Sequence, residues 1–271
     1  MKVTLKPAMK YVALGFSFYL IFLLAQLPAN KLYSFFEDIL EEQNIPLKVY
    51  GLSGSLWHGE AKRISYNGLH FNQVGWELHP LALLSGNLSA TLRYKNGTAD
   101  ASGLFSYGID GTITAENFRA NLEASEALKL AKIPAVKLGG EFKLNLPYWV
   151  ISDNRLVAVS GRLLWADAKS MFPQKLNLGN LVVDLSTGDD GIITAKLGDG
   201  GGPLALSGGL TLAPDGKYDF KGQFVARAGR NSVLGRALGF MARYNANGEA
   251  VMTRSGNIAE FGFLLGSGTR R

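Results

Sequence analysis

The feature that most constrains the fold of this chain is a two-residue hydrophobic alternation that begins near Leu47 and recurs along the rest of the sequence. Apolar and polar side chains alternate in each run, which is typical of strands with one covered face and one wet face. Clear examples are residues 88–94, 142–146, 181–185 and 218–224. Turn sequences lie between the runs, at Lys95-Asn96-Gly97, Asp110-Gly111, Gly188-Asp189-Asp190-Gly191, Pro214-Asp215-Gly216 and Asn247-Gly248. With 33 glycines and only 18% charged residues, the pattern predicts a mainly β protein with a curved antiparallel sheet.

Residues 11–27 form the one run in the sequence that is apolar enough to cross a bilayer. The run follows Lys2, Lys6 and Lys10 and ends at Pro28. A helix of this length, at about 1.5 Å per residue, reaches roughly 25 Å, the short end of what spans a hydrocarbon core. Because lysines precede the run and acidic residues follow it, the positive-inside rule places residues 1–10 in the cytoplasm and the bulk of the chain across the membrane.

A cleaved signal peptide is the alternative interpretation of this segment. The apolar run is longer than a typical signal core, and Leu27-Pro28-Ala29 is a poor cleavage site because Leu27 is large where a small residue is needed. We therefore favour a single transmembrane anchor at residues 11–27.

Residues 28–46 predict a juxtamembrane amphipathic helix that begins after Asn30 as its cap and ends at Pro46. Its apolar residues repeat with helical spacing, at Leu32, Phe35, Phe36, Ile39 and Leu40. The remaining positions carry mostly carboxylates, which anionic lipid headgroups would repel. We therefore expect the apolar stripe to pack on the domain formed by residues 47–271.

Two short helices are expected among the strands. Ser125 is expected to cap the first, which ends before Pro134, and Ser232 to cap the second, over residues 233–244. Arg236 and Arg243 are seven positions apart, so the pattern places both on one polar face of the second helix.

The sequence offers no catalytic constellation. It contains no cysteine, and His58, His70 and His79 lack metal-binding spacing. The glycine-rich segment 197–203 lacks the Lys-Ser/Thr pair of a phosphate loop, and it is interpreted as a hairpin connection. Asp184, Asp189 and Asp190 lack the ligand order of a calcium loop. We predict no catalytic, cofactor-binding or metal-binding residue, and no enzymatic activity.

Aromatic and basic residues leave a binding role open. Trp57, Trp76, Trp149 and Trp165 could line a groove, although large aromatic side chains more often belong to a core. The formal net charge is +6, and one basic cluster comprises Lys221, Arg227, Arg230, Arg236 and Arg243. For an exported domain, an anionic lipid or an acidic protein surface suits this charge better than a nucleic acid.

The chain resembles a known family, protein N of the bacterial type II secretion system. The resemblance rests on the short tail, the single anchor with its Leu-Pro step, and the segment Gly54-Ser55-Leu56-Trp57-His58-Gly59-Glu60-Ala61. The later segments Ser160-Gly161-Arg162-Leu163-Leu164-Trp165 and Asn121-Leu122-Glu123-Ala124 fit it as well.

The resemblance implies a single-pass protein of the bacterial inner membrane with a cytoplasmic amino terminus and a periplasmic β-rich domain. Its expected role is that of a non-enzymatic scaffold that supports export of folded exoproteins through protein–protein contacts. The expected partners are the inner-membrane platform and the subunits that link it to the secretin. The resemblance carries over no cofactor and no site residue.

An alternative function follows from the same alternation. The periplasmic sheet is similar to those of AsmA- and TamB-like proteins, which bind or transfer lipid in an apolar groove. If the apolar face is closed by side chains or helices, the scaffold role is favoured. If the face is an open trough, phospholipid becomes the expected ligand.

Overall fold

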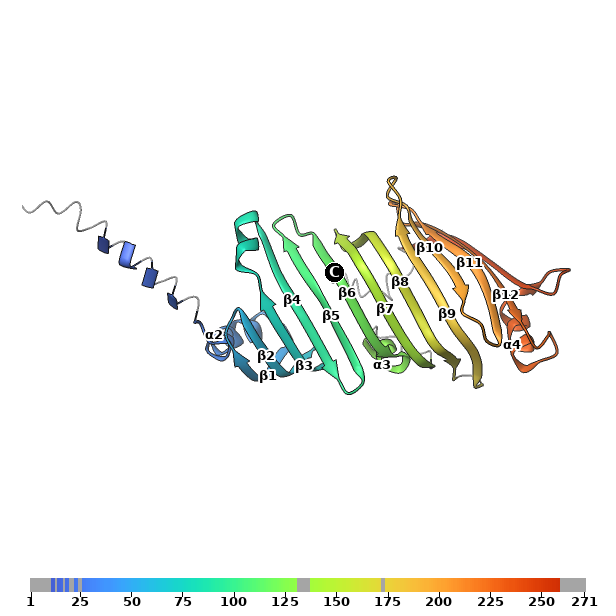
Figure 1. Ribbon diagram of the computed structural model, residues 1–271, viewed down its shortest axis with the longest axis horizontal. Coiled ribbons are helices and arrows are strands. Elements are labelled where there is room, and N and C mark those ends of the chain that lie inside the picture. The colour runs from blue at the N-terminus through green and yellow to red at the C-terminus, as the bar shows by residue number, and fades with distance from the viewer. Residues whose placement is uncertain are drawn as a thin grey trace, which may run out of the picture.

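The computed structural model describes residues 11–12, 14–16, 18–19, 22–23, 26–130, 137–171 and 174–258. Within these residues the strands form a single 14-stranded antiparallel sheet (Figure 1). The strands are β1 (Leu47–Gly54), β2 (His58–Tyr66), β3 (Leu69–Leu78), β4 (Asn87–Asn96), β5 (Ala99–Gly108), β6 (Ile113–Glu123), β7 (Leu138–Ser152), β8 (Arg155–Ser170), β9 (Leu176–Thr187), β10 (Ile193–Asp199), β11 (Leu204–Leu212), β12 (Lys217–Ala226), β13 (Arg243–Tyr244) and β14 (Ala250–Asn257). The predicted mainly β fold with one antiparallel sheet is confirmed.

The order of strands in the sheet follows the order of the chain from β1 to β12. At the far end β14 pairs with β12, and the two-residue β13 lies outside β14. From β2 to β11 each strand therefore lies between its neighbours in sequence, which is the arrangement that successive hairpins produce.

Five of the turns that connect the strands are predicted from the sequence. All five predicted turn sequences fall between paired strands, from Asn96-Gly97 between β4 and β5 to Asn247-Gly248 between β13 and β14. At the β7–β8 connection, Asp153 and Asn154 both adopt positive φ, at 51° and 59°. This backbone matches the right-handed twist of the strands that it joins.

Irregularities within the strands bend the sheet. Gln73, Asn117 and Asp167 have positive φ inside β3, β6 and β8, and the strand registers of β6 and β8 shift close to these positions. Bulges of this kind bend a strand and raise its local twist. Figure 1 shows the strands turning progressively along the sheet toward β12.

Helix α2 (Ala29–Glu42) confirms the amphipathic helix expected after the apolar run. Its predicted cap is wrong, because the helix begins at Ala29 after Pro28, and Asn30 lies within the first turn. Proline is well suited to this place, since it has no N–H to leave unpaired. Tyr33 fastens α2 to β1: its hydroxyl accepts a hydrogen bond from the Val49 amide at 3.1 Å.

The other helices are short. They are the 3-10 helix η1 (Pro80–Ser85), α3 (Ala124–Leu130) and α4 (Val233–Met241). Ser232 caps α4 as predicted, with its hydroxyl accepting from the Gly235 amide at 3.0 Å. Ser125 does not cap α3, because that helix already begins at Ala124 as β6 ends. Arg243 lies in β13 rather than on the polar face of α4.

In the part of the chain that the structure describes, no helix is both long and apolar enough to span a membrane. Residues 13, 17, 20, 21, 24 and 25 of the expected anchor lie outside the described residues, as does the tail 1–10. The transmembrane anchor therefore stays a prediction. The same holds for the boundaries between tail, anchor, juxtamembrane helix and β-rich domain at residues 10, 27 and 46.

Candidate functional site

One face of the sheet is apolar from end to end. The strand register places Val49 opposite Ile64, and Ile64 opposite Phe71. The same face continues through neighbouring pairs in the order Trp76–Leu92, Ala90–Phe105, Ala115–Trp149, Leu163–Val183, Ala195–Leu210 and Leu206–Phe224. The predicted alternation thus produces a continuous apolar surface on a single layer of strands.

Little of this surface is covered by other parts of the described chain. No large side chain there is fully buried, and most of the completely buried residues are alanines. A buried cluster lies at one end and brings together Leu234 and Leu238 of α4 with Leu204 and Leu206 of β11. The expectation that helices cover the apolar face is therefore met near β9–β14 and in part where α2 lies against β1–β4.

The first open region is a cavity of about 480 Å³ between α2 and strands β1–β4. Leu32, Tyr33 and Phe36 face it from the helix. The sheet contributes Val49, Leu52, Ile64, Val74, Trp76, Leu78, Ala90 and Leu92. The lining is almost wholly apolar, and the indole N–H of Trp76 is occupied by the Leu56 carbonyl at 2.9 Å.

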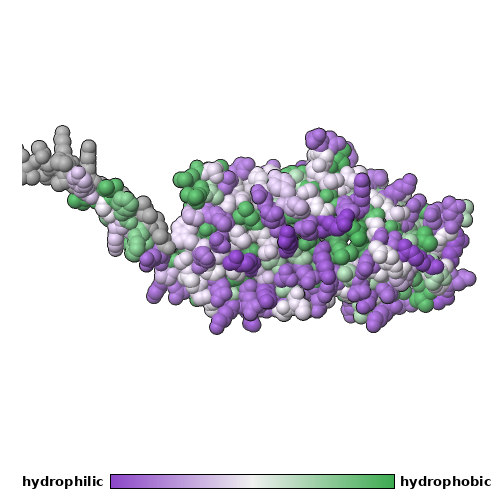
Figure 2. Space-filling model, viewed as in Figure 1, coloured by the Kyte–Doolittle hydropathy of each residue, from purple (hydrophilic) through white to green (hydrophobic). Residues whose placement is uncertain are grey.

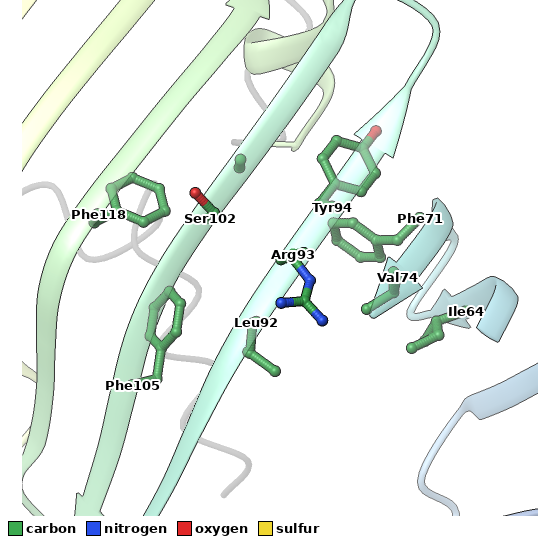
Figure 3. A pocket seen from close by; sticks show the side chains of 10 residues that line it. Ile64, Phe71, Val74, Leu92, Arg93, Tyr94, Ser102, Phe105 and Phe118 are labelled. Carbon is green, nitrogen blue, oxygen red and sulfur yellow. The ribbon is translucent and has the colours of Figure 1, made fainter. Parts of the chain in front are cut away.

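A second cavity of about 270 Å³ adjoins the first and shares Ile64, Val74 and Leu92 with it. Figure 3 shows Phe71, Val74 and Ile64 on one side of this cavity and Phe105 and Phe118 on the other, with Leu92 and Tyr94 of β4 between them. The Phe71–Tyr94 and Phe105–Phe118 ring pairs are both edge-to-face at 6.0 Å. The two cavities together form one apolar groove, from α2 to β6.

Exposure of the side chains shows that the groove is open. Leu92, in the middle of the groove, is 37% exposed, and the opposed pair Leu88 and Tyr107 are 51% and 54% exposed. Isolated exposed leucines are common, but a continuous apolar surface in contact with water is costly and marks a binding surface.

Polar groups occur at the end of the groove beneath α3. Glu126 of that helix accepts hydrogen bonds from the Tyr94 hydroxyl at 2.7 Å and from the Asn96 side-chain amide at 2.9 Å. Burial, together with this carboxylate, raises the pKa of Tyr94 to about 12. The phenol is neutral at physiological pH, and its hydrogen bond with Glu126 forms a polar end of the groove.

The histidines and aspartates considered in the sequence lie apart from the groove's apolar lining. His70 lies 2.9 Å from the Ser65 hydroxyl, and His79 lies 2.9 Å from the Thr91 hydroxyl. Asp184 pairs with Arg162, which holds the pKa of that carboxyl below its ordinary value. Among the described residues, no group of three His, Asp or Glu side chains is placed to hold a metal ion.

The glycine-rich segment 197–203 forms the connection between β10 and β11, as predicted. The Asp199 carboxylate accepts from the Gly201 amide at 3.0 Å and from the Leu206 amide at 2.9 Å. Arg227 donates to the same carboxylate at 2.6 Å. The Gly201 amide of this connection is therefore hydrogen-bonded to Asp199 of the same segment.

The tryptophans divide between groove and core. Trp76 lines the first cavity, and Trp149 lies on the same face with its ring 6.0 Å from that of Phe105. Trp165 packs against the buried cluster near α4 and donates to the Gly139 carbonyl at 3.0 Å. The sequence could not separate the roles of Trp76, Trp149 and Trp165, because all three lie in strands with the same alternation, whereas Trp57 lies in the β1–β2 turn.

The predicted basic cluster is tied to its own chain. Arg230 lies over the ring of Tyr244 at 4.6 Å and donates to the Asn245 carbonyl at 2.9 Å. Arg236 donates to the Asn231 carbonyl at 2.9 Å. These contacts hold the α4 region together. Arg227 is paired with Asp199, so three of the five residues of the cluster bind groups of their own chain.

Residues 46–253 match the family model for protein N of the type II secretion system. The chain belongs to this family. The matched region runs from the start of β1 into β14 and so contains all the strands of the groove, whereas α2 precedes it. The chain is therefore a component of the type II secretion system.

Relatives from three bacteria carry the same name, type II secretion system protein N. That of Vibrio cholerae is 25% identical over 217 residues, which are 78% of this chain and 85% of the relative. That of Aeromonas hydrophila is 26% identical over 266 residues, which are 94% of this chain and all of the relative. That of Klebsiella pneumoniae is 26% identical over 80% of this chain and 82% of the relative. No solved structure matches the chain.

Proposed function

We propose that this protein is a non-enzymatic, inner-membrane subunit of the type II secretion machinery that holds lipid acyl chains on the open apolar face of its sheet. The observation that carries the proposal is the groove between α2 and β6, which is almost wholly apolar and partly exposed to water. Among the described residues, the Tyr94–Glu126 pair forms a polar end of the groove.

The dimensions of the groove suit an acyl chain. Neighbouring strands lie about 4.8 Å apart, so the path from β1 to β6 covers roughly 24 Å. A hydrocarbon core is about 30 Å thick, which gives each leaflet roughly 15 Å. A groove of this length therefore accommodates a chain laid across the strands.

Native mass spectrometry of the full chain, released gently from membranes, tests this function. We expect phospholipid bound in a defined ratio. Ala101 lines the second cavity, so A101W should fill it and lower the bound lipid several-fold. The control K95W places the same indole on the polar face, since Lys95 lies one residue beyond Tyr94 on β4, and should leave the lipid unchanged. An empty wild-type protein would refute lipid binding.

Contact with other secretion subunits through the sheet edge is the second candidate function. In β14, only Ala250 and Val251 pair with β13, so residues 252–256 have no strand on their outer side among the described residues. An open edge of this kind can accept a strand from a partner. The platform and secretin-linking subunits are the partners that the proposed role implies.

Photo-crosslinking in cells checks this candidate. A crosslinker at Thr253 on β14 should capture a secretion subunit, and the same crosslinker at Thr98 in the β4–β5 turn should not. Equal yields from both positions, or none from Thr253, would count against edge pairing while leaving the lipid result untouched.

A further inference from the structure

A group of exposed apolar side chains lies at one end of the sheet, outside the groove. It consists of Leu81, Leu83 and Leu84 of η1 together with Ile109 of the β5–β6 turn, and we call it the apolar tip. Leu81, Leu84 and Ile109 are 78%, 87% and 93% exposed. Helix η1 contains no charged residue, and Figure 2 shows a hydrophobic patch over η1 at the upper left of an otherwise largely hydrophilic view.

The tip is held in place by backbone contacts. Gly86 closes η1 in a left-handed conformation, with φ of 76°, and its carbonyl accepts from the Ile109 amide at 3.1 Å. The Ser85 hydroxyl donates to the Ala82 carbonyl at 2.8 Å. The two turns are therefore joined, so their apolar side chains project together.

The tip lies at the end of the sheet where the apolar run 11–27 arrives. The Leu27 carbonyl accepts from the Leu56 amide at 2.8 Å, in the β1–β2 turn. The next residue in that turn, Trp57, accepts from the Leu78 amide at 2.7 Å, where β3 ends and η1 is about to begin. A short chain of hydrogen bonds thus leads from the end of the expected anchor to the tip.

Other turns at the same end of the sheet are different in character. Strand alternation brings the β7–β8, β9–β10 and β11–β12 turns to this end, and they carry Asp153, Asp189, Asp190 and Asp215. Asp110, beside Ile109, is turned to its own loop and accepts from the Thr112 amide at 3.0 Å. The end of the sheet is therefore apolar near the expected anchor, whereas the turns farther from it carry aspartates, of which Asp215 is paired with Lys217 at 2.7 Å.

We propose that the apolar tip inserts into the interface of the membrane that holds residues 11–27. Insertion removes the exposed leucine and isoleucine side chains of the tip from water, which is the favourable contribution to binding. The turns that carry aspartates lie farther along the sheet from the tip, and anionic headgroups would repel their carboxylates. The occupant of this surface is a lipid bilayer.

Insertion of the tip would dock the groove on its lipid source. The pair Leu88 and Tyr107 lies on the apolar face directly after the tip, and the next pair along the same two strands is Ala90 and Phe105, whose residues line the two cavities. An acyl chain leaving the bilayer beside the tip would meet apolar side chains along its whole path. This inference rests on the proposed anchor and extends the proposed lipid binding.

The absence of cysteine makes single-site labelling direct. The full chain carrying G15C, L84C or T98C is labelled with an environment-sensitive fluorophore and reconstituted into phosphatidylethanolamine–phosphatidylglycerol vesicles that contain lipid brominated near the headgroup. We expect the labels at 15 and 84 to be quenched several-fold more than the label at 98, which lies in a turn at the opposite end of the sheet.

The outcomes separate the three proposals. Quenching at 15 with equally weak quenching at 84 and 98 overturns tip insertion and leaves the anchor standing. Weak quenching at 15 overturns both. The label at position 84 should remain quenched when L84C is combined with A101W. Tip insertion is therefore measured independently of lipid binding in the groove. A further variant, L84D, should keep the melting temperature of the wild type and lower the lipid recovered; unchanged lipid would refute delivery through the tip.

Discussion

Gly161 is a position where the sheet requires glycine. It lies in β8 with φ of 138°, and a Cβ there would collide with the Asn145 carbonyl and lie 2.7 Å from Leu146 Cα. The register between β7 and β8 shifts beside this contact. The backbones approach closely here because no side chain separates them.

Substitution of Gly161 should therefore be costly. We expect G161A to lower the free energy of unfolding by about 2 kcal/mol or more, through backbone strain and the displaced β7 strand. Gly198 of β10 is the matched control, because no atom lies within 4 Å of its added Cβ, and G198A should change stability by less than about 1 kcal/mol. Urea unfolding of both variants provides the measurement, and equal costs would contradict the close-contact argument.

The charged Asp199 side chain stabilises the β10–β11 connection through its hydrogen bonds. The Arg227 guanidinium, and then the Leu206 amide, hold the pKa of that carboxyl below its ordinary value. The side chain is 13% exposed. A lowered folded-state pKa means that the stabilisation is present above the unfolded value of about 3.9 and is lost as the pH falls through the folded value.

The D199N variant should lose this pH dependence. At neutral pH we expect it to be about 2 kcal/mol less stable than the wild type, because it loses charge-assisted hydrogen bonds. The difference should shrink as the pH falls below about 4, where the wild-type carboxylate becomes protonated. D189N, at an exposed turn, is the control for the change in net charge. A gap between wild type and D199N that stays constant into acid would show that the charge is not the cause.

Helix α2 docks through only part of its apolar stripe. Leu32 and Phe36 line the first cavity, whereas Phe35 is 70% exposed. The helical spacing of five apolar residues predicted one docked face, and the structure divides that face between sheet and solvent. A stripe wider than the contact with β1 leaves its outer members uncovered.

Truncations in α2 distinguish its two sides. We expect L32A to lower the free energy of unfolding by about 1–2 kcal/mol, since the side chain is partly buried against the sheet. F35A should cost less than about 0.5 kcal/mol. Thermal or urea unfolding of the domain measures both, and the reverse order would mean that α2 packs through its other side.

The helices also show what local sequence can predict. Ser232 predicts the start of α4, because its hydroxyl is placed to accept from the third amide of the helix. Ser125 fails for α3, because that helix begins directly from the end of β6 at Ala124. Capping residues predict a helix start well where the preceding chain is free, and poorly where a strand fixes the entry.

For the whole molecule, the alternation predicts the sheet and its turns but not the state of its apolar face. Leu92 and Leu206 both lie on the apolar face, yet Leu92 lines an open groove and Leu206 belongs to the buried cluster that includes residues of α4. The difference comes from which helix reaches which strand, a tertiary property that a two-residue period does not encode. From the sequence, an open groove is therefore one of two alternatives for the apolar face. The structure is what identifies it as a candidate site.

The strand order also predicts how the sheet opens. Strands β7 and β8 are the longest, and each has partners on both sides, whereas β1 and the β13–β14 pair form the edges. We expect backbone amides of β7 and β8 to exchange with deuterium most slowly and protection to fall toward both edges, since a single layer can fray from its ends. Uniform protection across all strands would show instead that the sheet opens as one unit.

The agreement between strand order and chain order has a consequence for biosynthesis. From β1 to β12 every new strand pairs with the one made just before it, so the polypeptide closes only short loops as it becomes free to fold from its amino-terminal side. No early strand waits for a distant partner. The growing edge alone is left unpaired at each moment, and the next hairpin covers it, so assembly of the sheet can keep pace with the appearance of the chain.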